Sequence, residues 1–314
     1  MEFNQPSENI NEFSTKNIRL NDNSATDDSK SIINPQCDCQ NGSSSFERNL
    51  EEELSIVRDS SYIYAIGKIE PRFPSLSLEK EFTQITGRFD TKGLTDRQVF
   101  YKLLSDRSNR YIVRKLCWVF TIEGLDTYIL QPYDSSDIEL LTEAIRPSPS
   151  LTDLDVIVGL RGPLAQPNLC NGLMVPIVIL SQIYSFDIES LIKSIPVPEH
   201  MDEEKFTPIA EELFMKIMQM ADNAGTTDEH RALNYLSVRY PAIYSLTAER
   251  FDNNYSLTAV EVRPSRLSGI RKVFDTIFSF THRQTDVTEK YFCRVDVTEE
   301  FPFLVTKLSP FYER

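Results

Sequence analysis

The chain has 314 residues, of which 47 are acidic and 33 are Lys or Arg, so its formal net charge is −14. This balance argues against a nucleic-acid-binding protein, because a phosphate-binding surface needs clustered Lys and Arg. The most apolar stretch, residues 173–186, contains Pro176, Ser181 and Gln182 and is too short to cross a bilayer.

Residues 1–60 form an acidic leader with 12 acidic and 5 basic side chains, a net charge of −7. The leader is rich in Asn, Ser, Asp and Glu, and it lacks the apolar periodicity that would offset the entropy of ordering. We therefore expect it to be largely disordered. The first residues lack the basic and apolar regions of a signal peptide. Together with only five cysteines, this predicts a cytoplasmic protein.

From residue 61 onward the composition predicts a folded domain that spans residues 61–314. Its first half mixes strands with short helices. Residues 62–67 are β-prone and predict the first strand. Thr95 and Gln98 have the spacing of a helix-capping box, and residues 117–130 predict a hairpin around Gly124. A helix over residues 138–146 and strands over 153–158 and 175–184 follow.

The middle of the chain has helical periodicity over residues 206–220 and 228–240, until Pro241 interrupts it. The β pattern then returns in four segments: residues 257–262, 274–280, 291–297 and 303–305. Strands, a helical middle section and further strands predict an α+β fold with a mixed or antiparallel sheet.

No common catalytic motif is present: there is no nucleophile elbow, Walker loop, dinucleotide-binding loop or zinc-protease motif. The three histidines, His200, His230 and His282, are far apart in sequence. We therefore assign no catalytic residue. The acidic run that includes Asp228 and Glu229 is typical of a helix start.

Arginines offer the clearest binding signal. Arg263 and Arg266 stand in the densest basic segment, which continues to Arg271 and Lys272, and Arg72 follows the first predicted strand. Guanidinium groups bind carboxylates through forked hydrogen bonds, so we consider Arg72, Arg263 and Arg266 candidate residues for binding a peptide, with an acidic peptide or a carboxylate as the ligand of the segment from Arg263. A solvated turn between two strands is the alternative for the segment from Arg263.

The cysteines suggest a metal site. Cys37 and Cys39 form a close pair in a segment that otherwise lacks core residues. A structural zinc takes four thiolates, and Cys117 and Cys170 are the candidates to complete such a set, although zinc sites more often have two to four residues between paired cysteines. Separate structural cysteines and a redox pair are the alternatives.

Ordered stretches of the sequence resemble the carboxy-terminal domain of PatG-type cyanobactin maturation proteins. The resemblance covers about residues 62–314. The stretches that carry it are residues 64–75, 93–98, 109–111, 117–119, 122–125, 161–163, 169–176, 220–225, 239–244 and 297–310.

The resemblance implies a role in cyanobactin biosynthesis, in which ribosomal precursor peptides are modified, cut and macrocyclised. Members of the family often have a close cysteine pair before the first strand, where Cys37 and Cys39 stand here, so the resemblance also implies the zinc site. Family domains usually follow a subtilisin-like protease, but no serine-protease motif precedes residue 62, and protease or macrocyclase activity is not carried over.

These observations favour a non-catalytic accessory module that binds the precursor peptide or a partner maturation protease. An enzyme of unrecognised mechanism that acts on the modified peptide is one alternative. A structural unit that forms homodimers is another.

Overall fold

In a computed structural model, residues 61–87, 92–199 and 201–312 are described, and they form an α+β fold with two sheets. The prediction of fold class is therefore confirmed. Within these ranges no helix has both the length and the apolar character needed to span a membrane. The prediction that residues 1–60 are disordered concerns a segment outside the described residues.

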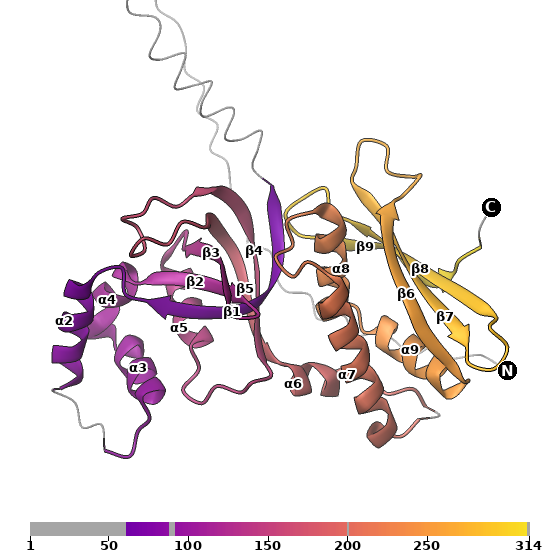
Figure 1. Cartoon of the computed structure of the whole chain (residues 1–314), viewed down its shortest axis with the longest axis horizontal. Helices are drawn as coiled ribbons and strands as arrows, with labels where there is room; N and C mark the ends of the chain where they lie inside the picture. Colours follow the sequence, from indigo (N-terminus) through magenta and orange to yellow (C-terminus); the bar gives the residue numbers. More distant parts are fainter. Residues whose placement is uncertain (1–60, 88–91, 200, 313–314) are drawn as a thin grey trace, which may run out of the picture. The chain divides into compact units, whose positions relative to one another are not determined.

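The first sheet closes into a barrel with the strand order β1-β2-β3-β5-β4 (Figure 1). Neighbouring strands are antiparallel except β3 and β5, whose parallel pairing runs from Ile129–Ile177 to Gln131–Ile179 and closes the barrel. The strands are β1 (Tyr62–Arg72), β2 (Cys117–Ile122), β3 (Leu125–Gln131), β4 (Asp153–Leu164) and β5 (Pro176–Asp187).

Four helices add side chains to the barrel core, and a short 3-10 helix joins two of them. Buried residues of the strands, such as Phe120 and Ile157, pack in one cluster with Leu104, Ile112 and Leu141 of these helices. The elements are α2 (Leu76–Thr86), α3 (Asp96–Ser105), η1 (Arg107–Asn109), α4 (Arg110–Lys115) and α5 (Ser135–Ala144).

The second sheet is an antiparallel meander with the order β6-β7-β8-β9, and helices pack on one of its faces. Phe274, Phe278 and Phe280 of β7 alternate toward these helices, as a half-buried strand requires. The elements are α6 (Ile188–Lys193), α7 (Glu203–Met220), α8 (Asp228–Arg239), α9 (Ala242–Asp252), β6 (Tyr255–Pro264), β7 (Val273–His282), β8 (Thr288–Asp296) and β9 (Phe303–Pro310).

The loop between α7 and α8, together with helix α8 itself, binds strand β1 of the barrel. The Ile66 amide donates to the Asn223 carbonyl at 2.9 Å, and the fully buried Asn234 side chain donates to the Tyr64 carbonyl at 2.8 Å. Gly225 has φ +59°, and a Cβ there would lie 2.0 Å from the Tyr64 carbonyl oxygen. Only glycine fits this close approach, so the loop's position on β1 depends on it.

Candidate functional site

The face of the second sheet that points away from the helices carries the charged residues of interest. Because Phe274 and Cys293 point toward the helices, their neighbours Asp275 in β7 and Arg294 in β8 point to the opposite face. Asp275 and Arg294 are register partners, and Arg263 of β6 is the partner of Asp275 on its other side. Three adjacent strands therefore place an Arg-Asp-Arg row across this face.

A cavity of about 760 Å³ lies over this row, and we call it the arginine cavity. Its volume falls within the range of small-molecule pockets. The residues that line it are Arg263, Pro264, Arg266, Leu267, Asp275, Arg294, Phe311 and Tyr312.

Arg294 is held in place by one edge of its guanidinium group. Its Nε donates to Asp275 Oδ1 at 2.8 Å and to Ser265 Oγ at 3.3 Å, and its side chain is 22% exposed. Asp275 and Ser265 are both buried, and the Phe292 ring lies 4.8 Å from the guanidinium carbon. Within the part of the chain that is described, neither terminal nitrogen of Arg294 has a hydrogen-bond partner.

Arg263 and Arg266 are more exposed than Arg294. Arg263 lies over the Phe311 ring at 5.0 Å and has only a long contact of 3.9 Å with Glu261. Arg266 is exposed and has no hydrogen bond or ion pair to any described residue. The arrangement can bind an anion, because the cavity contains more cationic groups than its own carboxylates neutralise.

Sequence reasoning predicted Arg263 and Arg266 but missed Arg294 and Asp275. The alternation of Phe292, Cys293 and Arg294 indicates that Arg294 and the apolar Cys293 point to opposite faces. The pairing register that brings Arg294 beside Asp275 is visible only in the folded sheet.

Arg72, the third arginine predicted to bind a peptide, lies in the barrel rather than in the second sheet. Both of its terminal nitrogens donate to Asp126 at 2.6 Å, and Glu70 lies at 3.4 Å. The hydrogen bonds that Arg72 donates to the Asp126 carboxylate raise the pKa of Arg72. The structure does not bring Arg72 together with Arg263 and Arg266. The two terminal nitrogens of Arg72 already donate to Asp126. A role of Arg72 in peptide binding stays a prediction.

Two of the four cysteines predicted to bind zinc meet in space. Cys117 and Cys170 are joined by a disulfide with a Cα–Cα distance of 5.7 Å, and both are buried. A disulfide offers no thiolate, so these sulfurs can bind zinc only after reduction. Cys37 and Cys39 lie outside the described residues, within which no group of three metal-binding side chains occurs. The zinc site stays a prediction.

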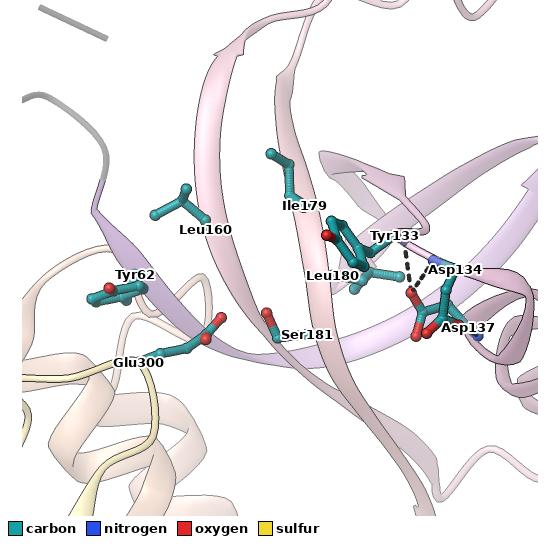
Figure 2. A pocket seen from close by; sticks show the side chains of 9 residues that line it. All are labelled: Tyr62, Tyr133, Asp134, Asp137, Leu160, Ile179, Leu180, Ser181 and Glu300. Atoms are coloured by element: carbon teal, nitrogen blue, oxygen red, sulfur yellow. Dashed lines mark hydrogen bonds between the residues drawn. The ribbon is translucent and has the colours of Figure 1, made fainter. Parts of the chain in front are cut away.

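A second hollow of about 410 Å³ crosses the outside of the barrel, and we call it the acidic trough. Figure 2 shows Tyr62 and Glu300 on one side of it and Tyr133, Asp134 and Asp137 on the other, with Leu160, Ile179, Leu180 and Ser181 between them.

Two of the carboxylates of the acidic trough act as helix caps. Asp137 accepts hydrogen bonds from the backbone amides of Tyr133 at 2.7 Å and Asp134 at 3.1 Å (Figure 2). Asp134 accepts from the amides of Ser136 and Asp137, which completes a capping box at the start of α5. Hydrogen bonds from Ser136 lower the pKa of Asp134. These contacts account for both side chains without a ligand.

Comparison with known proteins finds a family model that matches part of the chain and a solved structure with a similar fold. Residues 200–311 match the family described as PatG C-terminal. A solved structure described as "PatG Domain of Unknown Function" has the same fold, with a TM-score of 0.67 and 19% sequence identity, and the match covers 80% of this chain and 98% of that one. No curated protein matches the chain.

Proposed function

From the match of residues 200–311 to the PatG C-terminal family, we propose that the chain is a non-catalytic recognition module in cyanobactin biosynthesis. It binds the precursor peptide or a partner maturation protease, and it acts in the cytoplasm. The resemblance of the longer sequence stretches and the shared fold with the PatG domain support the choice of pathway.

The observation that carries the binding role is the arginine cavity. It combines an oriented guanidinium group, two more exposed arginines and aromatic side chains in one hollow on an open sheet face. Arginine stays protonated in proteins and therefore does not serve as an acid or base at neutral pH. These groups suit recognition better than catalysis.

The test is titration calorimetry of the full chain against the cognate precursor peptide and against each partner protease. Binding of at least one of them, weakened when Arg263 and Arg266 are both changed to Gln, is the expected result. If none binds, the recognition role is rejected. Measuring the solution mass of the free chain in parallel separates recognition from homodimerisation.

We also propose that Cys37, Cys39, Cys117 and Cys170 hold a structural zinc when the chain is reduced. Four thiolates would close the coordination shell, so the metal would contribute to folding rather than to chemistry. Metal analysis of protein purified under reducing conditions, without added zinc, is expected to find one zinc per chain. The metal should be lost in the Cys37→Ser/Cys39→Ser variant, and folded, metal-free wild-type protein would reject the site.

A further inference from the structure

We infer that the arginine cavity takes a carboxylate that belongs to a peptide and lies next to an apolar side chain. The inference rests on the proposed recognition function and names the chemistry of the ligand. The carboxylate can come from the carboxyl terminus of a peptide or from a Glu or Asp side chain, and both sources share the same planar, monovalent group.

The geometry of Arg294 selects a planar anion. A guanidinium group has a side edge, which includes Nε, and an end edge formed by the two terminal nitrogens. Asp275 and Ser265 occupy Nε, while no described residue bonds to the terminal nitrogens. The end edge is therefore oriented by buried contacts and remains available for two parallel hydrogen bonds to a carboxylate.

The charge balance favours one negative charge on the ligand. Three guanidinium groups face two nearby carboxylates, Asp275 and Glu261, and the contact between Glu261 and Arg263 is long and partly exposed. Among the described residues of the cavity one positive charge therefore remains uncompensated, which matches a carboxylate rather than a doubly charged phosphate. Arg266 supplies a cation that has no hydrogen bond or ion pair to a described residue.

The apolar lining indicates what stands beside the carboxylate. Phe311 packs edge-on against Phe292 at 5.5 Å, and it lies beneath Arg263. Leu267 is 71% exposed and Tyr312 is 80% exposed. Such exposed large side chains around a charged centre suit a ligand that carries an aliphatic or aromatic group.

The test uses four forms of an N-acetylated tetrapeptide, Gly-Leu-Glu-Gly, titrated into the full chain at low salt. The forms combine a Glu or a Gln with a free carboxyl terminus or an amidated one. The forms that carry a carboxylate should bind, and comparing the two single-carboxylate forms identifies which source is preferred. Equal binding of the form without any carboxylate, or no binding of any form up to millimolar concentration, would overturn the inference, as would displacement by inorganic phosphate more readily than by acetate.

Arg294→Lys keeps a positive charge near Asp275 but removes the two terminal guanidinium nitrogens. We therefore expect the affinity for a carboxylate to fall at least about tenfold, which corresponds to one lost charged hydrogen bond. Arg283→Lys is the matched control. The Nε of Arg283 also donates to a serine, Ser256, and its guanidinium group stacks on the Phe251 ring.

Arg263→Gln leaves the Arg294–Asp275 pair intact and is a second variant in case Arg294→Lys folds poorly. If these cavity variants bind as the wild type does, the inference is wrong.

The outcomes separate this inference from the proposed function. If the precursor peptide or a protease binds with unchanged affinity to Arg294→Lys, recognition stands and the carboxylate inference fails. If the tetrapeptides bind as expected but no pathway protein does, the carboxylate site stands and the proposed function fails.

Discussion

The arginine cavity and the acidic trough are both surface hollows with charged residues at their rims, yet the charges are used differently. In the acidic trough, Asp134 and Asp137 receive hydrogen bonds from backbone amides at the start of α5. In the arginine cavity, Asp275 and Ser265 bond only one edge of Arg294 and leave its terminal nitrogens without a described partner. A charged residue in a hollow indicates a binding site when the fold orients it and leaves it available.

Arg231 is a buried charged residue whose terminal nitrogens are bonded within the protein. It is only 2% exposed, and it donates to the carbonyls of Val297, Glu299 and Glu300 and to Asp228. It therefore fixes the turn that places Glu300 at the rim of the acidic trough.

The largest expected effect on stability comes from Arg231→Met. The substitution leaves the three carbonyls without the guanidinium donor and leaves Asp228 with Lys272 as its remaining cation, so the free energy of unfolding should fall by about 3 kcal/mol or more. Urea unfolding followed by circular dichroism measures the change. Arg283→Met, at an exposed arginine, is the control and should change stability by less than about 0.5 kcal/mol. Equal effects at the two positions would contradict the role assigned to Arg231.

A smaller effect is expected from Asp137→Ala in the acidic trough. The buried Asp137 carboxylate accepts from two backbone amides, so its loss should lower the free energy of unfolding by about 1–2 kcal/mol. Glu300→Gln removes a carboxylate at the same hollow that has no ion pair to a described residue, and it should have almost no effect. An unchanged unfolding midpoint for Asp137→Ala would show that the carboxylate does not act as a cap, and the acidic trough would again become a candidate binding site.

Local features were predictable because their causes are local. Thr95 and Gln98 form the capping box that their spacing predicts. The hairpin of β2 and β3 turns at Glu123 and Gly124, whose φ values of 50° and 80° suit a tight turn. The two long helices of the middle section are also confirmed, since their apolar faces pack on the second sheet.

Pro241 shows how a correct local rule can mislead. It ends the periodicity of α8, as predicted, but it also precedes a helix, α9, that the sequence reading did not name. With φ −56°, proline is already in the backbone conformation of a helix start, where its missing amide costs nothing.

The pairing of strands that are far apart in the sequence could not be predicted. The parallel contact that closes the barrel joins Ile129 to Ile177, and no local pattern marks it. The same limit hid the pairing of Arg294 with Asp275, although Arg263 and Arg266 stood out as a basic segment. The residues at the rim of the arginine cavity were predictable, and the one at its base was not.

Apart from the control variants, the smallest effect on stability should come from Arg266→Ala, which also gives the sharpest contrast between the two hollows. Arg266 is exposed and has no described partner, so the free energy of unfolding should change by less than about 0.5 kcal/mol. Its charge nevertheless contributes to the field at the mouth of the arginine cavity, and a rim charge affects the association rate more than the dissociation rate. Stopped-flow measurement with the Gly-Leu-Glu-Gly form that has a free carboxyl terminus should therefore show slower association, with a weaker dependence on salt.

Glu300→Gln is the matched change at the acidic trough and should leave the association rate unchanged, because that hollow takes no part in carboxylate binding. If Glu300→Gln slows association as much as Arg266→Ala does, the two hollows do not differ in the way that their contacts indicate.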